Sequence, residues 1–507
     1  MKQGVRLLAA GVLAAFALAA FAAEPQLVTT HHQIHAKGQV LSYTAWAGLI
    51  PIRNNEAGDI HAHIFFVAYT LDRPPGQPPR PVTFLWNGGP GSNSVLVHMV
   101  GFGPRRIRSS DDAAHPTDVQ PAMEDNDATW LDVTDLVFVD PVGTGFSRPT
   151  KAEYAPEFYS TLGDIASVAE FIRVYRTRFD LFDAPIFLAG ESYGTWRASG
   201  VAEALEKKGS HVAGAMLISG GIQMGPVSPD AVRTALFVPN RTAAAFYHSR
   251  LAPELMRDET ATMKEVEAWA LAEYAPAWER RDQLSDAERD KIIAQLAKYT
   301  GVEPAAIDRK TLMMTSPQFT AALLWDQGVV PGRYDMRVTG QTAATDTSAR
   351  NRVILRYLRN ELGVKNDLAY QGIEEGYSSV PAARGGSLAA RWVWDQLATP
   401  MNTAEVAAGR TASSAVGSGD GPPPAQPWLR RAMAIDPSLK VFLAAGLYDS
   451  LNSCADNAYL AAHTQPPEFG RNITTGCYRA GHMMYDTKEA RYSLKRDVAA
   501  FIRNASR

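Results

Sequence analysis

Short apolar runs separated by polar, glycine-containing stretches recur through the first half of the chain and again near its end. Runs bounded by turn residues are typical of buried strands, and here they lie at residues 60–70, 82–86, 135–139, 186–189, 212–219 and 439–445. Before the fourth run, residues 153–180 place apolar side chains on one helical stripe, which predicts an amphipathic helix. A strand, a helix and a further strand in this order predict an α/β fold with a mostly parallel central sheet.

The alternation of strands and helices stops between residues 224 and 429, where the sequence becomes helical and charged. A capping box at Ser285 predicts the start of one of these helices. We expect residues 224–429 to form a helical cap inserted into the core, so that residues 23–223 and 430–507 are the two parts of one α/β core. The composition of residues 411–427, rich in glycine, serine and proline, predicts a flexible segment within the cap.

The first 22 residues have the composition of a secretory signal peptide. Lys2 and Arg6 precede an apolar run at 7–21, and small residues surround the expected cleavage site after Ala22. The alternative is an uncleaved membrane anchor, but the run is shorter than the roughly 18 apolar residues that a span requires. We therefore expect an exported protein, periplasmic or secreted, with no stable membrane insertion after cleavage.

Charge and cysteine content narrow the function classes. The formal net charge of -3 and the isoelectric point near 6.4 give no basic footprint, so nucleic acid is not an expected partner. The two cysteines are Cys454 and Cys477, and in an exported chain we expect them to form a disulfide. Two free buried thiols are the alternative.

Histidines near the start of the chain raise the question of a metal site. They stand at positions 31, 32, 35, 61 and 63. No cysteine or clear carboxylate cluster accompanies them, so we interpret them as strand-surface residues rather than zinc ligands. We expect neither a metal nor a cofactor.

Residues 190–194 read Gly-Glu-Ser-Tyr-Gly and contain the leading candidate for chemistry. They follow the apolar run at 186–189 and precede a helix-prone stretch, so Ser192 stands at a tight turn between a strand and a helix. This pattern is typical of a nucleophile elbow, in which glycines permit a strained turn and the helix directs its first amides toward a developing oxyanion. An ordinary strand-to-helix turn is the alternative.

A glycine-rich loop, Asn-Gly-Gly-Pro-Gly-Ser at residues 87–92, directly follows the run at 82–86. Glycines at this place allow backbone amides to turn toward a ligand, as an oxyanion hole requires of the loop that precedes the nucleophile. Taken alone, the loop fits a glycine-rich hairpin equally well.

Two residues late in the chain complete a candidate triad. Asp449 follows the run at 439–445, and His482 stands in a loop before a helix predicted at 488–503. Ser192, Asp449 and His482 have the chain order of α/β-hydrolase triads. In such a triad His482 takes the proton of Ser192, while Asp449 orients the imidazole and stabilises its charged form. Taken singly, Asp449 fits a turn residue and His482 a surface residue equally well.

Four motifs together resemble those of the serine carboxypeptidase family, peptidase family S10. They are the loop at 87–91, Asp-Pro-Val-Gly-Thr-Gly-Phe-Ser at 140–147, the elbow at 190–194 and Gly-His-Met at 481–483. The resemblance covers roughly residues 64–222 and 439–503, with a poorly matched cap between them. It implies an α/β-hydrolase fold and an enzyme that removes C-terminal residues from peptides through an acyl-enzyme.

The resemblance also implies roles around the nucleophile. The amides of Gly89 and Tyr193 would form the oxyanion hole, and the side chains of Asn87 and Glu191, with the amide of Gly88, would hold the free carboxylate of the peptide. A glutamic acid can hydrogen-bond to a carboxylate only if one of the two carries a proton. Because burial raises the pKa of a carboxyl group, we expect peptide hydrolysis to be fastest at mildly acidic pH. A salt bridge from Glu191 to an arginine is the alternative.

The chain departs from the family pattern at three places. Ser92 stands where members commonly have a cysteine, no glutamine separates Asp140 from Pro141, and Gly101 replaces a glutamic acid. In the family that glutamic acid shares a hydrogen bond with the one preceding the nucleophile, so its absence bears on the acidic optimum. Ser92 and the single downstream cysteine pair resemble the bacterial branch of the family.

The leading interpretation is an exported serine carboxypeptidase acting on peptides with a free C-terminus. The first alternative is an esterase or acyltransferase on the same scaffold, since the triad attacks any activated acyl group and only carboxylate recognition separates the two. The second is a non-catalytic envelope protein that keeps the fold as a binding module, against which the intact triad argues.

Overall fold

The computed structural model describes residues 27–222, 224–225, 227–339, 347–374, 388–396, 401–402 and 426–506. The predicted signal peptide at 1–22 and most of the flexible segment predicted at 411–427 lie outside the described residues.

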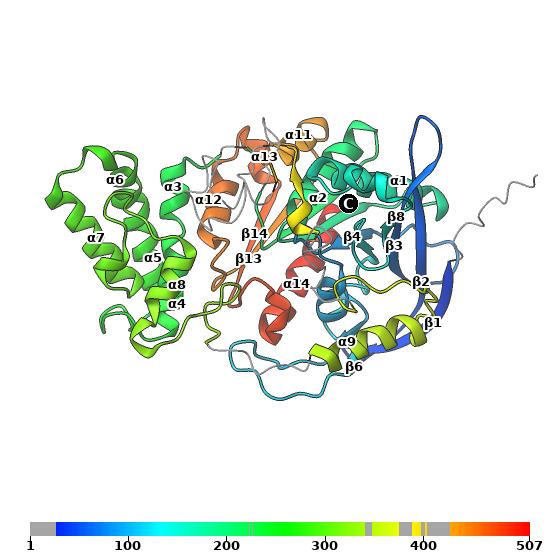
Figure 1. Ribbon diagram of the computed structural model, residues 1–507, viewed down its shortest axis with the longest axis horizontal. Coiled ribbons are helices and arrows are strands. Elements are labelled where there is room, and N and C mark those ends of the chain that lie inside the picture. The colour runs from blue at the N-terminus through cyan, green and yellow to red at the C-terminus, as the bar shows by residue number, and fades with distance from the viewer. Residues whose placement is uncertain are drawn as a thin grey trace, which may run out of the picture.

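One ten-stranded sheet forms the centre of the molecule (Figure 1). Its strands, in spatial order, are β1 (Val28–Ala36), β2 (Gln39–Arg53), β3 (Ile60–Leu71), β7 (Asp135–Asp140), β4 (Val82–Trp86), β9 (Ile186–Glu191), β10 (Gly214–Ile218), β13 (Lys440–Gly446) and β14 (Ile473–Tyr478), with β8 (Arg148–Pro149) beside β3. The strands from β7 to β14 pair in parallel, while β1, β2 and β3 pair antiparallel and β3 joins β7 antiparallel. The predicted α/β fold with a mostly parallel sheet is confirmed.

Strand β14 was missed because it carries no apolar run. It reads Ile-Thr-Thr-Gly-Cys-Tyr, and only its first and last residues are buried. It is the last strand in the order, paired on one side with β13, so most of its side chains face solvent rather than the core.

Two apolar clusters cover opposite faces of the sheet, because successive side chains of a strand point to opposite sides. On β3, Ile64 and Phe66 belong to one cluster, and Phe65 and Val67 belong to the other. The first cluster takes in α1 (Thr161–Arg178), α2 (Gly194–Lys207), α11 (Trp428–Ile435), α12 (Cys454–His463) and α13 (Pro467–Arg471). The second takes in the π-helix η1 (Leu96–Phe102) and α14 (Lys488–Ala505).

Helix α1 begins later than its apolar stripe predicts. The stripe predicted a helix over 153–180, whereas residues 152–157 form a 3-10 helix that contains Pro156. The α-helix starts after Ser160, whose hydroxyl accepts a hydrogen bond from the amide of Gly163 at 3.2 Å. A proline cannot donate within a helix, so the capping serine sets the start.

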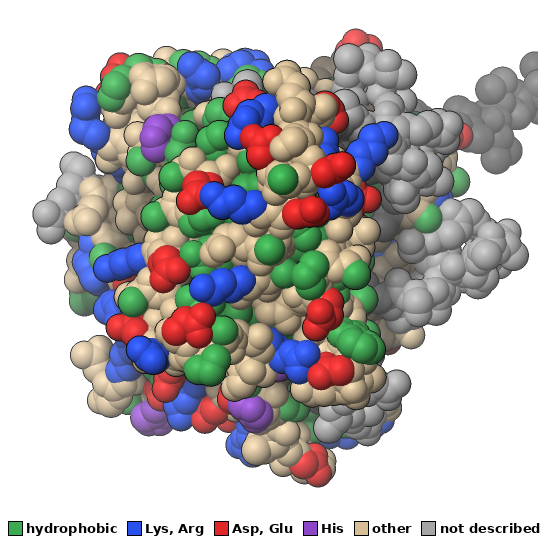
Figure 2. Space-filling model, turned by 90° about the vertical axis from the view of Figure 1, so that its left-hand side faces the viewer, with side chains coloured by type: hydrophobic (Ala, Val, Ile, Leu, Met, Phe, Trp, Pro, Cys, Tyr) green, Lys and Arg blue, Asp and Glu red, His purple; other side chains and the backbone are tan. Residues whose placement is uncertain are grey.

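A third apolar cluster, made by residues between 231 and 336, lies at one end of the molecule, apart from the sheet (Figure 1). Its helices are α3 (Asp230–Ala235), α4 (Val238–Tyr247), α5 (Glu259–Trp269), α6 (Ala275–Glu279), α7 (Asp286–Thr300) and α8 (Ser316–Leu323). The capping box predicted at Ser285 is present and opens α7. Figure 2 shows this end of the molecule, where Lys and Arg side chains are interspersed with Asp and Glu.

Part of the predicted insertion packs with the sheet instead of with these helices. Helix α9 (Thr347–Arg356) and the π-helix η7 (Tyr357–Glu361) begin a segment whose apolar residues, up to Ile373, join the sheet's second cluster. The Tyr357 hydroxyl lies 2.9 Å from that of Tyr69 on β3. We therefore propose that the cap is the cluster between residues 231 and 336, rather than all of 224–429.

The remaining strands are short pairs, β5 (Arg105–Ile107) with β6 (Met123–Asp125) and β11 (Val393–Trp394) with β12 (Met401–Asn402). None of the helices within the described ranges is both long enough and apolar enough to cross a bilayer.

Candidate active site

The candidate residues meet at the C-terminal end of the sheet, because each follows the carboxyl end of a parallel strand. The loop at 87–89 follows β4, Ser192 follows β9, Asp449 lies after β13 and His482 after β14. These strands are near neighbours in the order β4–β9–β10–β13–β14. In sheets of this kind, ligands bind outside the carboxyl ends of the strands.

Ser192 stands in the strained backbone conformation of a nucleophile elbow, with φ at 58°. The turn is so tight that a Cβ on Gly190 would lie 1.9 Å from the carbonyl oxygen of Gly194. A Cβ on Gly194 would lie 2.9 Å from the Trp86 ring. The glycines on both sides of Ser192 are therefore required by space, and helix α2 starts directly after the turn.

His482 and Asp449 form a buried hydrogen-bonded pair. Nδ1 of His482 lies 2.8 Å from Oδ2 of Asp449, and the two side chains are 4% and 0% exposed. Burial disfavours the imidazolium, but the carboxylate of Asp449 outweighs it and raises the pKa of His482. Nε2 of His482 is buried and has no hydrogen-bond partner among the residues that the structure describes. That nitrogen is the one left to act as a base.

Ser192 and His482 are both anchored to the end of β10. The amide of Ser192 donates to the carbonyl of Ile218 at 2.9 Å. The hydroxyl of the next residue, Ser219, donates to the carbonyl of His482 at 2.7 Å. The amide of His482 also donates to the carbonyl of Tyr334 at 2.6 Å, so the loop is fixed from two sides.

The glycine-rich loop after β4 lies directly against the elbow. A Cβ on Gly88 would lie 2.5 Å from the amide nitrogen of Tyr193 and 2.9 Å from Cβ of Ser192. Gly89 has φ at 105°, a conformation that side chains other than glycine's rarely adopt. The loop therefore brings its backbone beside the first amides of α2, the arrangement that an oxyanion hole needs.

Asn87 and Glu191 are buried and joined to each other. Nδ2 of Asn87 donates to Oε1 of Glu191 at 2.9 Å, and Oδ1 of Asn87 accepts from the amide of Val97 at 3.0 Å. Burial raises the pKa of Glu191 to about 7, while His482 lowers it. At Oε1 the partner of Glu191 is an amide rather than the arginine considered as the alternative. Oε2 makes no hydrogen bond of good geometry in the described part of the chain.

Sequence reasoning missed Arg197, which supports this arrangement from within α2. Its side chain is fully buried; Nη1 donates to the carbonyl of Asn87 at 2.8 Å and Nε donates to Asp164 at 2.8 Å. Asp164 also accepts from the Tyr193 hydroxyl at 3.1 Å. The sequence signal that could have revealed Arg197 was an arginine on a helix face otherwise made of small residues.

Aromatic residues from the predicted cap region reach the elbow and were also missed. The ring of Tyr193 lies 5.5 Å from that of Trp392 and 5.8 Å from that of Trp394, and Trp394 also packs against Trp196. No motif marked Trp392 or Trp394, because the contact joins residues about 200 positions apart.

The motif at 140–147 supports the site through hydrogen bonds to a neighbouring segment and lies outside the site itself. The buried Asp140 accepts hydrogen bonds from the amide of Ser94 at 2.8 Å and from the Tyr370 hydroxyl at 2.7 Å. The Ser147 hydroxyl donates to the Asp140 carbonyl at 2.6 Å. The motif thus fixes the chain that follows the glycine-rich loop.

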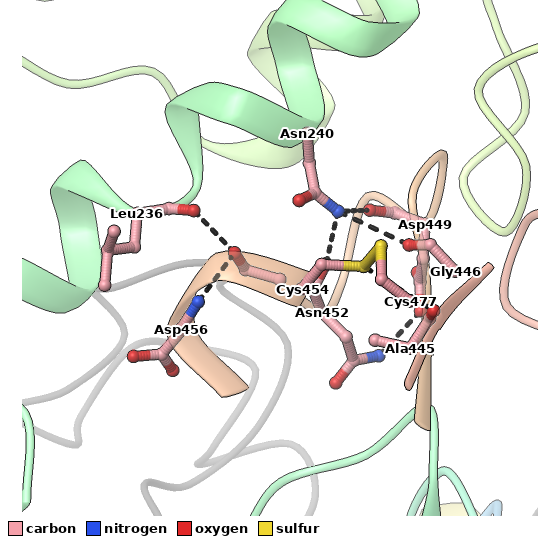
Figure 3. Close-up of a disulfide and its surroundings, with 10 residues drawn as sticks. Leu236, Asn240, Ala445, Gly446, Asp449, Asn452, Cys454, Asp456 and Cys477 are labelled. Atoms are coloured by element: carbon pink, nitrogen blue, oxygen red, sulfur yellow. Dashed lines mark hydrogen bonds between the residues drawn. A yellow bond between two sulfur atoms is a disulfide. The ribbon is translucent and has the colours of Figure 1, made fainter. Parts of the chain in front are cut away.

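A disulfide joins Cys454 to Cys477, with a Cα–Cα distance of 5.5 Å (Figure 3). Cys454 begins α12 just after Asp449, and Cys477 lies on β14 just before His482, so the bond ties the two loops of the pair together. From the cap, Nδ2 of Asn240 donates to the carbonyl of Asn452 at 2.8 Å in the same loop (Figure 3).

Replacing both cysteines with alanine is expected to lower the free energy of unfolding by about 3 kcal/mol, because the disulfide closes a 23-residue loop in the unfolded chain. Urea unfolding followed by tryptophan fluorescence measures the difference. Reductant should destabilise the wild type by the same amount and leave the double variant unchanged; an equal effect on both would contradict the prediction.

Within the described ranges, one group has the spacing of metal ligands: Glu206, His211 and Asp436. They precede β10 and β13 or end α2, so they lie at the opposite edge of the sheet from Ser192. Among the histidines considered in the sequence, His61 on β3 pairs with Glu157 at 2.8 Å.

A family model described as serine carboxypeptidase matches residues 37–318. The matched range includes the glycine-rich loop and the elbow, and it ends before Asp449 and His482.

Curated relatives match a shorter stretch. The pheromone-processing carboxypeptidase of Meyerozyma guilliermondii is 27% identical over 157 residues, which cover 30% of this chain and 21% of that protein. That of Komagataella phaffii is 31% identical over 159 residues, covering 30% of this chain and 22% of the relative. The chain thus spans about a fifth of the length of these relatives.

Solved structures are similar over most of the chain at low identity. A prohormone-processing carboxypeptidase from Saccharomyces cerevisiae has a TM-score of 0.45 at 16% identity and covers 91% of both chains. A proline iminopeptidase from Mycobacterium smegmatis has a TM-score of 0.35 at 10% identity, covering 90% of this chain and 98% of the other. Because the family model matches more than half of the 507 residues, the chain belongs to the serine carboxypeptidase family.

Proposed function

We propose that this protein is a serine carboxypeptidase that releases C-terminal amino acids from peptides, with Ser192 as nucleophile, His482 as base and Asp449 as the residue that orients the base. The observation that carries the proposal is the buried pair of His482 and Asp449, whose free ring nitrogen lies at the same sheet edge as the strained Ser192. Family membership supports the same reaction class.

The first half of the reaction forms an acyl-enzyme. Nε2 of His482 accepts the proton of the Ser192 hydroxyl as its oxygen attacks the carbonyl carbon of the last peptide bond. The amides of Gly89 and Tyr193 donate to the oxyanion of the tetrahedral intermediate. His482 then gives the proton to the leaving amine, so the C-terminal amino acid departs and the remaining peptide stays on Ser192 as an ester. Water, activated by the same base, hydrolyses that ester.

Recognition of the free C-terminus is the second part of the proposal. Asn87, Glu191 and the amide of Gly88 lie beside the nucleophile, where the carboxylate of the departing residue would stand. The protonated carboxyl of Glu191 can donate to that carboxylate, whereas its ionised form would repel it. The raised pKa of Glu191 therefore permits binding of a substrate anion by a buried acid.

Release of the C-terminal amino acid from an N-blocked dipeptide between pH 4 and 8 tests the proposal. The wild type should cleave the free-acid dipeptide, and neither Ser192→Ala nor wild type on the C-terminally amidated peptide should release product at a comparable rate. Cleavage of simple esters with no cleavage of any free-acid peptide would favour an esterase or acyltransferase instead.

Preference for the free acid over a substrate without a carboxylate is expected to fall as pH rises through about 7, because Glu191 then loses its proton. The ratio of kcat/KM for the free-acid peptide to that for a matched ester measures this preference and cancels the titration of His482, which both substrates share. Glu191→Gln keeps a donor at every pH, so its ratio should be flat across the range. A ratio equally pH-dependent in the glutamine variant would contradict the role of Glu191.

Export belongs to the same proposal. Residues 1–22 carry the pattern of a signal peptide, and the disulfide fits an oxidising compartment. Fractionation of expressing cells, with N-terminal sequencing of the mature protein, should find it outside the cytoplasm and starting near Ala23.

A further inference from the structure

Oε2 of Glu191, the residue before the nucleophile, and the hydroxyl of Tyr485 are both buried, and neither makes a hydrogen bond of good geometry among the described residues. The two side chains nevertheless lie within reach of each other, since each shifts the pKa of the other. Tyr485 is fully buried and follows His482 by only three positions. Buried polar atoms are rarely left unpaired, so a pair of them at one site points to a function.

Gly101 lies directly against the Tyr485 ring. A Cβ on Gly101 would lie 3.2 Å from Cδ1 of Tyr485, which is tighter than ordinary contacts. The ring also packs edge-on against Phe102, with 5.4 Å between centroids. The π-helix η1 and the loop after His482 thus hold the phenol in one place, where a larger residue at position 101 would press on it.

The surroundings of Glu191 show that the phenol acts on it. Burial raises the pKa of Glu191; His482, Tyr485 and Asn87 lower it, and Asp486 raises it. In turn, burial raises the pKa of Tyr485 well above its ordinary value, and the charges of Glu191 and Asp486 raise it further. The phenol therefore keeps its proton throughout the working range, so it is a permanent donor facing a carboxyl group that titrates.

We propose that Tyr485 is a positioning residue of the carboxylate-binding site, whose hydroxyl donates to Oε2 of Glu191 and, together with Asn87 on Oε1, fixes the carboxyl group toward the substrate's C-terminus. This inference rests on the proposed function. In this chain the phenol of Tyr485, which keeps its proton, holds the carboxyl group of Glu191. A second carboxyl group in its place would have to share one proton with Glu191.

Tyr485→Phe tests the inference because it removes only the hydroxyl and keeps the ring. Losing a donor that favours the ionised form raises the pKa of Glu191, so preference for the free-acid peptide over the ester should persist to higher pH than in the wild type. At low pH, where Glu191 is protonated in both proteins, KM for the free-acid peptide should rise about 3- to 10-fold with kcat little changed, the size of one hydrogen bond. Kinetics on the ester should not change.

Tyr478→Phe is the matched control. Tyr478 lies on β14, and its hydroxyl donates to Asp497 on α14 at 3.0 Å, outside the site. It should leave both the KM and the pH dependence of the preference unchanged. Gly101→Ala is a second test variant, because its added Cβ presses on the Tyr485 ring. It should raise KM for the free-acid peptide and leave the kinetics on the ester unchanged.

The outcomes separate this inference from the proposed function. If the wild type shows no preference for the free acid at any pH, the carboxylate-binding role of Glu191 fails, and the role of Tyr485 fails with it. If the wild type and Glu191→Gln behave as proposed but Tyr485→Phe matches the wild type in KM and in pH dependence, only the inference about Tyr485 is overturned.

Discussion

Replacing Ser192 with alanine is expected to lower kcat/KM on N-blocked dipeptides by about 10⁴-fold or more, because no other group in a triad can replace the nucleophilic oxygen. Loss should be as large for esters as for peptides, since both pass through the same acyl-enzyme. Steady-state release of the free amino acid measures the peptide reaction, and the burst of alcohol from an activated ester measures acylation directly.

Ser199→Ala provides the control for this variant. Ser199 lies on the same helix, α2, and its buried hydroxyl donates to the Thr195 carbonyl at 2.8 Å instead of facing the site. It should retain kcat/KM within a few-fold of the wild type. If Ser192→Ala kept an ester burst, or if both serine variants lost activity equally, Ser192 would not be the nucleophile.

Most of the strands that position the site could be predicted because each carries its own local signal; β14, which leads to His482, has no apolar run and could not. Strand β4 coincides with the predicted run at 82–86, and the elbow at 190–194 has the glycines that the steric contacts require. The buried hydrogen bond between His482 and Asp449 agrees with the pairing expected from the triad order in the sequence. Their catalytic roles are a proposal. Local sequence thus located the edge of the sheet at which the candidate residues gather.

What could not be predicted depends on contacts between distant parts of the chain. Tyr485 was visible beside His482, but its position against Glu191 depends on the space left by Gly101, nearly 400 residues earlier. In the same way, Trp392 reaches Tyr193 from beyond the helical cluster. In the sequence, Gly101 was interpreted only as the loss of the glutamic acid that the family has there. In the structure, the absence of a side chain at this position leaves room for the Tyr485 ring.

Glu191 and His482 are best understood as one coupled unit. Each changes the other's pKa, because the carboxylate favours the imidazolium and the imidazolium favours the carboxylate. The proposed mechanism needs the opposite arrangement, a neutral imidazole and a protonated Glu191, so under it the pH limits of peptide hydrolysis belong to the pair rather than to either residue. Comparing free-acid and ester substrates is what separates the two contributions.

Asp449→Asn is expected to lower kcat by about 10⁴-fold with little change in fold, because it reverses the tautomer of His482. Oδ1 of Asp449 accepts from the backbone amide of Leu451 at 2.9 Å, which cannot turn, whereas Oδ2 accepts from the side-chain amide of Asn452 at 2.7 Å, which can turn its oxygen toward a donor. In the variant the oxygen therefore stays on Leu451, and the new NH₂ group faces Nδ1 of His482. Nδ1 must then accept, which moves the ring proton to Nε2 and leaves no base for Ser192.

Asn452 supplies the matched comparison for this prediction. Its Nδ2 donates to Oδ2 of Asp449 at 2.7 Å, so Asn452→Ala removes a hydrogen bond from the same oxygen while keeping the negative charge and the histidine tautomer. We expect it to lose about 10- to 100-fold, the cost of one hydrogen bond to a charged group, which is far less than the loss in Asp449→Asn. The residual activity of Asp449→Asn should also reach its acid limit at lower pH, because Asp449 raises the pKa of His482. Equal losses in the two variants, with no shift of the acid limit, would show that Asp449 only holds the loop in place and does not orient the base.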